Sequence, residues 1–253
     1  MERTQDSLFD GELQCLQHRD GYRFSIDPVL LAHFVRLGKE EHILDLGAGC
    51  GVLGLILLYR FRSSISSITA FEFQTGLAML ARENCALNQF QKQMEIVEGD
   101  LSNIKQYFQP ESFSSVVCNP PFYSAGSGRK SHNKEAEIAR HQVSCTLTEI
   151  LFAAAMAVKN RGKVYIVYPA ESLGSLLILL EQHRLTVKRM QLVYSYPDPS
   201  MSSRLLLIEA VKNGGEGMDI LAPFYVYDAK DGAYSEAMQQ FYKSNCDSLK
   251  GKE

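Results

Sequence analysis

The sequence predicts an α/β protein with a mostly parallel central sheet of seven strands and helices on both faces. Short apolar runs that suit buried strands alternate along the chain with segments whose apolar residues recur at helical spacing. Glycine-rich or polar residues follow several of these runs directly, where such sheets bind ligands. The 253 residues suffice for one large domain, and 45% hydrophobic and 22% charged residues are ordinary for a soluble globular protein.

In the first half of the chain, strands and helices alternate. Asp27 and Pro28 open a predicted helix over residues 27–37, with Asp27 as its cap and Pro28 at the first helical position. The apolar runs and periodicities then predict strands over residues 41–46, 67–72, 94–98 and 114–118, and helices over residues 52–61 and 77–88.

In the second half, Thr146 and Glu149 form a capping box. This pattern opens a predicted helix that runs through Val158 and is closed by Gly162. Further predicted elements are a strand over 163–168, a helix over 170–183, and a closing pair of strands over 185–194 and 204–211. The glycine-rich residues 214–217 are typical of a linker, so we expect a domain over residues 1–213 and a tail over 214–253.

Composition excludes several classes of protein. No apolar run near the N-terminus could span a bilayer, and residues 1–20 are polar with both charge signs, unlike a signal peptide. Six widely spaced cysteines without a CxxC pair indicate free thiols in a reducing cytoplasm and no metal site. We therefore expect a cytoplasmic protein without a membrane partner.

A glycine-rich turn follows the first predicted strand of the sheet. Gly49, Gly51 and Gly54 satisfy the pattern G-x-G-x-x-G, which lets a backbone approach a nucleotide closely. Glu72 lies at the end of the next predicted strand, where a carboxylate can accept both hydroxyls of a ribose. These two features alone leave an NAD(P)-dependent dehydrogenase open.

An acidic residue, Asp45, opens this turn and favours a different cofactor. A carboxylate attracts a cationic amine and repels a pyrophosphate. S-adenosylmethionine (SAM) carries an amino group and a sulfonium and has no phosphate, and Asp100 could accept a hydrogen bond from its adenine amino group. The predicted SAM-binding residues of the core are Asp45, Gly47, Gly49, Gly51, Glu72, Phe73, Asp100, Leu101 and Asn119.

The segment Asn119-Pro120-Pro121-Phe122 follows the fourth predicted strand and suits methyl transfer to a planar amino group. The Asn119 side-chain oxygen and the Pro120 carbonyl can each accept one N–H, which points the nitrogen lone pair at a methyl donor. Two prolines stiffen the turn, and Phe122 can stack on a base. We therefore predict these four residues as the catalytic set.

The motifs DLGAGCGVLGL, FEF, EGD and NPPFY, in this order, resemble those of class I SAM-dependent methyltransferases that methylate amino groups. The resemblance covers about residues 20–211 and implies a single Rossmann-like domain. It also implies an N-terminal lid over about residues 1–40, in which Tyr22, Ser25 and Asp27 lie near the methionine end of SAM.

The segment between the reaction motif and Thr146 is similar to that of the bacterial tRNA1(Val) adenine N6-methyltransferase family, which modifies the adenine 3′ of the anticodon. The resemblance rests on Gly126-Ser-Gly-Arg129 and Ala139-Arg140-His141, and it implies a substrate loop over about residues 122–143. Residues 120–213 hold 12 Lys and Arg against 7 Asp and Glu. The predicted RNA-binding residues are Arg129, Lys130, Lys134, Arg140, His141, Lys188, Arg189 and Arg204.

Other functions stay open at this point. An Asn-Pro-Pro-Phe motif also occurs in ribosomal RNA guanine N2-methyltransferases, and a related motif occurs in enzymes that methylate a glutamine of release factors. A protein of this fold that binds RNA without activity is a further alternative. The expected partner is tRNA or another structured RNA, and the sequence does not indicate an oligomeric state.

Overall fold

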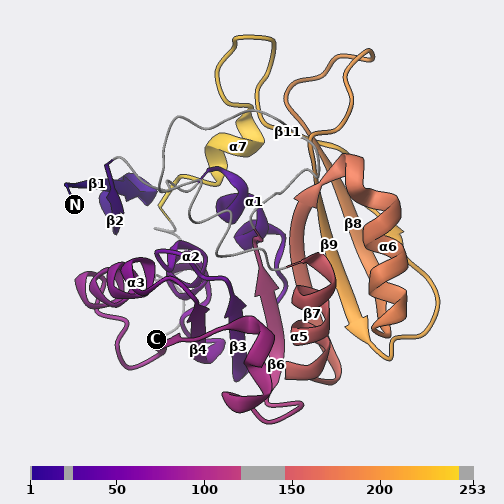
Figure 1. The fold of residues 1–253 in the computed structure, drawn as a ribbon. Coiled ribbons are helices and arrows are strands. Elements are labelled where there is room, and N and C mark those ends of the chain that lie inside the picture. Colours follow the sequence, from indigo (N-terminus) through magenta and orange to yellow (C-terminus); the bar gives the residue numbers. More distant parts are fainter. Residues whose placement is uncertain (1, 20–24, 121–145, 245–253) are drawn as a thin grey trace, which may run out of the picture.

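The computed structural model describes residues 2–19, 25–120 and 146–244 (Figure 1). A sheet of nine strands forms its centre, in the order β10-β8-β9-β7-β6-β3-β4-β5, with β11 also paired to β8. The strands are β3 (Glu41–Leu46), β4 (Ile65–Glu72), β5 (Met94–Glu98), β6 (Phe113–Cys118), β7 (Val158–Pro169), β8 (Leu185–Tyr194), β9 (Leu205–Lys212), β10 (Asp219–Ile220) and β11 (Phe224–Tyr225).

The predicted fold class is confirmed, and the strand count needs one correction. The seven strands expected from the sequence are β3 to β9, of which only β9 runs antiparallel to its neighbours. Two further strands of two residues each, β10 and β11, extend the sheet beside β8. Such short strands carry no apolar pattern of their own, so the sequence did not predict them.

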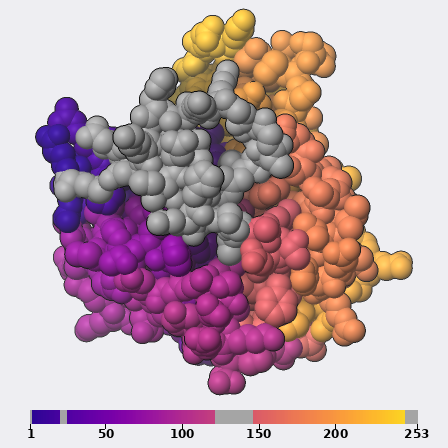
Figure 2. All heavy atoms as spheres, in the orientation of Figure 1, coloured from indigo at the N-terminus to yellow at the C-terminus, as the bar shows by residue number. Residues whose placement is uncertain are grey.

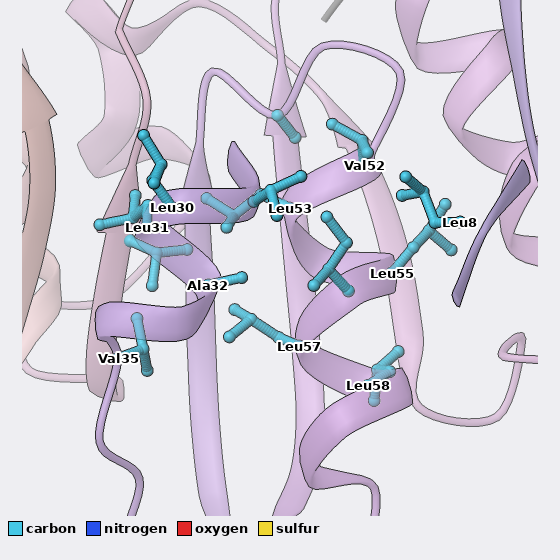
Figure 3. Packing of buried hydrophobic residues seen from close by; sticks show 14 of the residues in the cluster. Leu8, Leu30, Leu31, Ala32, Val35, Val52, Leu53, Leu55, Leu57 and Leu58 are labelled. Atoms are coloured by element: carbon cyan, nitrogen blue, oxygen red, sulfur yellow. The ribbon is translucent and has the colours of Figure 1, made fainter. Parts of the chain in front are cut away.

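Helices cover both faces of the sheet, as predicted. One face carries α1 (Asp27–Phe34), α2 (Val52–Phe61) and α3 (Thr75–Leu87). The other face carries η2 (Leu101–Gln106), α5 (Leu147–Ala157) and α6 (Leu173–Gln182), the last preceded by a short turn η3 (Ala170–Ser172). Each face encloses its own apolar core, and Figure 3 shows Leu57 of α2 beside Ala32 of α1, both fully buried.

Several predicted helix ends are wrong, among them the end of α1, which lies at Phe34 and not at residue 37. Asp27 is the first residue of α1 and not its cap, and its own N–H donates to the Ser25 hydroxyl at 3.2 Å. Gly162 does not close α5, because β7 already begins at Val158. A Cβ at Gly162 would lie 2.7 Å from the Ser114 carbonyl oxygen, so this glycine serves the close approach of β7 to β6.

An N-terminal hairpin, absent from the predicted elements, packs against the helical layer that contains α2 and α3. It comprises β1 (Arg3–Leu8), the turn η1 (Phe9–Gly11) and β2 (Leu13–His18), paired antiparallel. Its alternate residues Leu13 and Cys15 are buried. The hairpin lies at the surface of the molecule (Figure 2), near the edge of the sheet where β3 and β4 end.

Residues 236–241 pack against α1. The helix α7 (Glu236–Gln240) contributes Met238, which is fully buried. The ring of Phe241 stacks on His33 of α1 with 3.8 Å between centroids. Burial holds the pKa of His33 down at about 3, so its ring packs as a neutral group. This segment therefore supports the helix that begins at Asp27.

Among the residues that the structure describes, no helix combines the length and the apolar character that crossing a lipid bilayer requires.

Candidate active site

The predicted cofactor residues of the core, together with Asn119 and Pro120, gather at one edge of the sheet because they lie at or just after the ends of parallel strands. The register pairs Glu72 with Glu98, Leu46 with Phe71, and Leu46 with Cys118. Neighbouring strands lie about 4.8 Å apart, so Asp100, Glu72, the glycine turn and Asn119 follow one another along this edge. β3 has β4 on one side and β6 on the other, so the order of the strands reverses direction at β3. Sheets of this kind bind ligands at such a switch point.

The turn after β3 requires glycine at several positions. Gly47, Gly49 and Gly51 have φ values of +70°, +59° and +82°, a region that other residues rarely adopt. Gly54 serves packing instead, because a Cβ there would lie 2.9 Å from Cε of Met94 in β5. The turn therefore brings backbone, without side chains, to the ligand-binding edge.

Glu72 holds this turn in place from the neighbouring strand. Its Oε2 accepts the Gly49 N–H at 2.8 Å, and its Oε1 accepts the Gln74 N–H at 2.8 Å. Burial raises the pKa of Glu72, while these backbone donors favour the ionised form. A carboxylate accepts about four hydrogen bonds, so capacity remains for a ribose hydroxyl.

Asp45 is the residue that most directly supports a cationic ligand. Its side chain is buried, and its Oδ2 has no hydrogen-bond partner. Burial, and to a lesser extent the nearby Glu72 charge, raise the pKa of Asp45 to about 7. An orphaned buried carboxylate oxygen is costly and is satisfied by an ammonium group, so the site fits the amino group of SAM better than a phosphate.

A prediction about pH follows from Asp45. A carboxyl with a pKa of about 7 is neutral below that pH, and only its charged form attracts an ammonium group. We expect SAM affinity, measured by calorimetry, to weaken about tenfold for each pH unit below about 7, down to about pH 5.5. Asp45→Asn should bind weakly with a nearly flat profile, and any slope it retains reports Glu72. A flat wild-type profile would contradict this role of Asp45.

Three further predicted cofactor residues lie at the same edge. Asp100 caps η2, where its Oδ1 accepts the Ser102 N–H at 2.9 Å. Phe73 follows Glu72 and is 42% exposed, a large apolar surface for this edge of the sheet. Leu101 is half-buried at the start of η2. Their contact with SAM stays a prediction.

Asn119 and Pro120 follow β6 beside the glycine turn. The Cys118 thiol donates to the Leu46 carbonyl at 3.3 Å, which ties the end of β6 to the end of β3. Asn119 is half-buried and Pro120 is buried. The proposed partners Pro121 and Phe122 lie outside the described residues, as does Tyr22. Of the other two predicted lid residues, Ser25 is exposed and Asp27 is half-buried, and burial raises the pKa of Asp27.

The predicted RNA-binding set needs correction at Arg189. Arg189 is buried, where it pairs with Glu209 and donates to the Phe34 carbonyl at 3.1 Å, so it cannot contact a phosphate at the surface. Lys188 donates to the carbonyls of Gly215 and Glu216, at 3.1 and 2.9 Å. It precedes Val193 by five residues, so it lies about 16 Å back along β8 from the candidate site's edge.

Arg204 is the one described member of that set that is exposed at the edge of the candidate site. Its backbone N–H donates to the Val193 carbonyl near the end of β8, and its carbonyl accepts the N–H of Ala170, just after β7. The loop over residues 195–204 projects from this end of the sheet (Figures 1 and 2). Five other predicted RNA-binding residues lie outside the described residues: Arg129, Lys130, Lys134, Arg140 and His141.

Sequence reasoning missed two asparagines: Asn84 of α3, which is buried, and Asn88, which is half-buried and directly follows α3. Asn84 and Asn88 lie one helical turn apart and bond to the backbone of β2. Two amides four residues apart, on the face of a helix that otherwise carries apolar residues, are a signal that could have found them. Within the described ranges, no cluster of His, Cys, Asp or Glu side chains is arranged to hold a metal ion.

Comparison with known proteins places this arrangement in a family. The family model for the methyltransferase small domain matches residues 27–188. The chain is 28% identical over 228 residues to a tRNA1(Val) (adenine(37)-N6)-methyltransferase of Shewanella sp. strain MR-4, covering 88% of this chain and 91% of that protein. A protein of the same name from Shewanella halifaxensis is 28% identical over 235 residues, covering 88% and 94%.

Solved structures share the fold at low sequence identity. A structure titled a predicted O-methyltransferase, from Agrobacterium tumefaciens, has a TM-score of 0.67 and 19% identity, covering 86% of this chain and 97% of that one. A SAM-dependent methyltransferase from Aquifex aeolicus has a TM-score of 0.54 and 14% identity, covering 74% and 89%. The alternative of an NAD(P)-dependent dehydrogenase is therefore wrong: the chain belongs to the methyltransferase small domain family and is a SAM-dependent methyltransferase.

Proposed function

We propose that this methyltransferase modifies the exocyclic N6 amino group of an adenine in tRNA, next to the anticodon of valine tRNA, in the cytoplasm. The observation that carries the proposal is the position of Asn119, which follows β6 directly beside the glycine turn that ends β3. An amino group held there would lie at the same sheet edge as the predicted cofactor residues. Bound SAM supplies an electrophilic methyl group.

The chain's own residues supply position and hydrogen-bond acceptors. The exocyclic nitrogen of adenine is a weak nucleophile because its lone pair is delocalised into the ring. The Asn119 side-chain oxygen and the Pro120 carbonyl each accept one of its hydrogens, which directs the lone pair out of the ring plane. The ammonium formed by transfer is acidic enough to lose a proton to solvent, so these residues need not include a strong base.

The choice of tRNA as the substrate rests on the names of relatives and on basic residues. Relatives that align with most of this chain carry the name tRNA1(Val) (adenine(37)-N6)-methyltransferase. Arg204 is exposed at the proposed reaction edge, where it can contact a phosphate. In addition, Arg129, Lys130, Lys134, Arg140 and His141 follow the reaction motif in sequence, and we propose that they also contact RNA.

The substrate is tested by incubating the protein with SAM labelled in its methyl group and with unmodified tRNA, ribosomal RNA or a protein release factor. We expect label in tRNA, recovered as N6-methyladenosine when the nucleosides are separated by mass spectrometry. N2-methylguanosine in ribosomal RNA, or methylglutamine in the protein, would contradict the proposal. Tight tRNA binding without turnover would instead identify an inactive RNA-binding protein.

A further inference from the structure

Asn84 of α3 contacts both the N-terminal hairpin and the glycine turn. Its side chain is fully buried. Its Nδ2 donates to the Leu16 carbonyl at 3.0 Å, and its Oδ1 accepts the Leu16 N–H at 2.7 Å, so the amide pairs with β2 as another strand would. The same Nδ2 also donates to the Cys50 carbonyl at 2.9 Å.

Cys50 occupies the tightest part of the cofactor turn. It lies between Gly49 and Gly51, both in the left-handed region. The preceding residue, Gly49, is held from the other side by Glu72. Glu72 therefore fixes the Gly49 N–H, and Asn84 fixes the carbonyl of the next residue, Cys50; both side chains are buried. Without the second of these, the Cys50 carbonyl would be buried without a partner or would turn away.

The hairpin and the turn also meet directly at two thiols. Cys15 of β2 and Cys50 are both buried, and Asn84 Nδ2 lies 3.7 Å from the Cys15 sulfur. A hydrogen bond with the Cys50 thiol, together with burial, raises the pKa of Cys15. The thiol therefore stays protonated and reacts slowly with alkylating reagents while the hairpin is docked.

We propose that Asn84 is a positioning residue for the cofactor site, and that through it the docking of the β1–β2 hairpin and the binding of SAM stabilise each other. The coupling is reciprocal: if the docked hairpin increases SAM affinity, bound SAM stabilises the docked hairpin by the same free energy. This inference depends on SAM as the cofactor and is independent of which amine receives the methyl group, so it can be tested without RNA.

The structure offers a control in Asn88, which directly follows α3 and whose Nδ2 also donates to the Asn84 carbonyl at 2.8 Å. Asn88 bonds to the backbone of Gln14 as Asn84 does to that of Leu16: its Oδ1 accepts the Gln14 N–H at 2.9 Å and its Nδ2 donates to the Gln14 carbonyl at 2.7 Å. No bond from its side chain to the glycine turn is present. Asn88→Ala therefore loosens the hairpin, whereas Asn84→Ala loosens the hairpin and also frees the Cys50 carbonyl.

The first measurement needs no variant. The full-length protein is alkylated with iodoacetamide, with and without SAM, and labelling of each cysteine is followed by peptide mass spectrometry. Cys85, buried between α3 and β5, reports global unfolding. We expect SAM to slow the labelling of Cys15 in the hairpin severalfold more than that of Cys85. Equal effects on both thiols would overturn the coupling.

The second measurement compares the two variants by calorimetry with SAM alone. We expect Asn84→Ala to weaken SAM binding about tenfold, the usual result of leaving a buried carbonyl unpaired, and Asn88→Ala to weaken it less than about threefold. In turnover assays, the KM for SAM should rise in Asn84→Ala more than kcat falls. If both variants weaken SAM binding equally, or neither does, Asn84 has no positioning role; if Asn84→Ala does not fold, the wild-type labelling decides.

Discussion

Replacing Asn119 with alanine is expected to lower kcat about 100- to 1,000-fold, the usual effect of removing one preorganised hydrogen-bond partner of a reacting group. The expectation rests on the place of Asn119 directly after β6, beside the glycine turn that ends β3. Without its side-chain oxygen, one N–H of the substrate amine has no acceptor and the lone pair is no longer aimed. Single-turnover methylation of tRNA measures this effect on the chemical step.

Two variants make the result specific. Asn119→Asp keeps an acceptor oxygen at the same distance from the backbone, so it should recover part of the rate that Asn119→Ala loses. Asn160→Ala removes the same kind of side chain at the opposite edge of the sheet, where Asn160 bonds to Asn213, and should leave kcat unchanged. Because Asn119 is also a predicted contact of SAM, the loss in kcat must exceed any loss in SAM affinity. Unchanged turnover in Asn119→Ala would remove it from the mechanism.

Much of the fold could be predicted because parallel strands buried on both faces have a simple sequence pattern. The predicted bounds of β3, β5 and β8 match the structure at both ends, as do those of α2. The N-terminal hairpin escaped prediction because β1 has a single buried residue, Leu8, and β2 carries the polar Gln17 at a buried position. Asn84 and Asn88 bond to the backbone of β2 from a distant part of the sequence, so the sequence of the hairpin itself carries no sign of these contacts.

The candidate site was predictable where chemistry follows strand ends. Asp45, Glu72, Asp100 and Asn119 share an edge of the sheet because parallel strands end together, whatever their distance in sequence. Charge on β8 was misjudged for the opposite reason. Lys188 and Arg189 are adjacent in sequence, but the pairing of β8 with β9 is irregular between Val187 and Arg189, and Arg189 is buried while Lys188 is half-buried. A basic pair on a strand is therefore poor support for an RNA-binding surface.

The buried position of Arg189 predicts a large effect on stability and little on RNA binding. Arg189 and Glu209 form an ion pair whose side chains are each 8% exposed, and the guanidinium lies 4.3 Å above the ring of Phe34. Arg189→Met leaves the Glu209 carboxylate buried without its closest cation, with Lys163 Nζ 3.8 Å away. Breaking such a pair typically costs about 3–5 kcal/mol in the free energy of unfolding. For a chain of this size, that lowers the melting temperature by about 6–20 °C.

Replacing both partners separates the cost of an unpaired charge from the loss of a contact. Arg189→Met combined with Glu209→Leu buries two apolar side chains and should recover most of the lost stability, since removing both charges removes the uncompensated one. Folded Arg189→Met should bind tRNA as the wild type does at low temperature, whereas Arg204→Ala should bind it more weakly and with a shallower salt dependence. A variant of Arg189 that keeps its stability but loses tRNA affinity would contradict the assignment. Loss of a buried ion pair lowers stability, and a buried side chain does not contact tRNA directly.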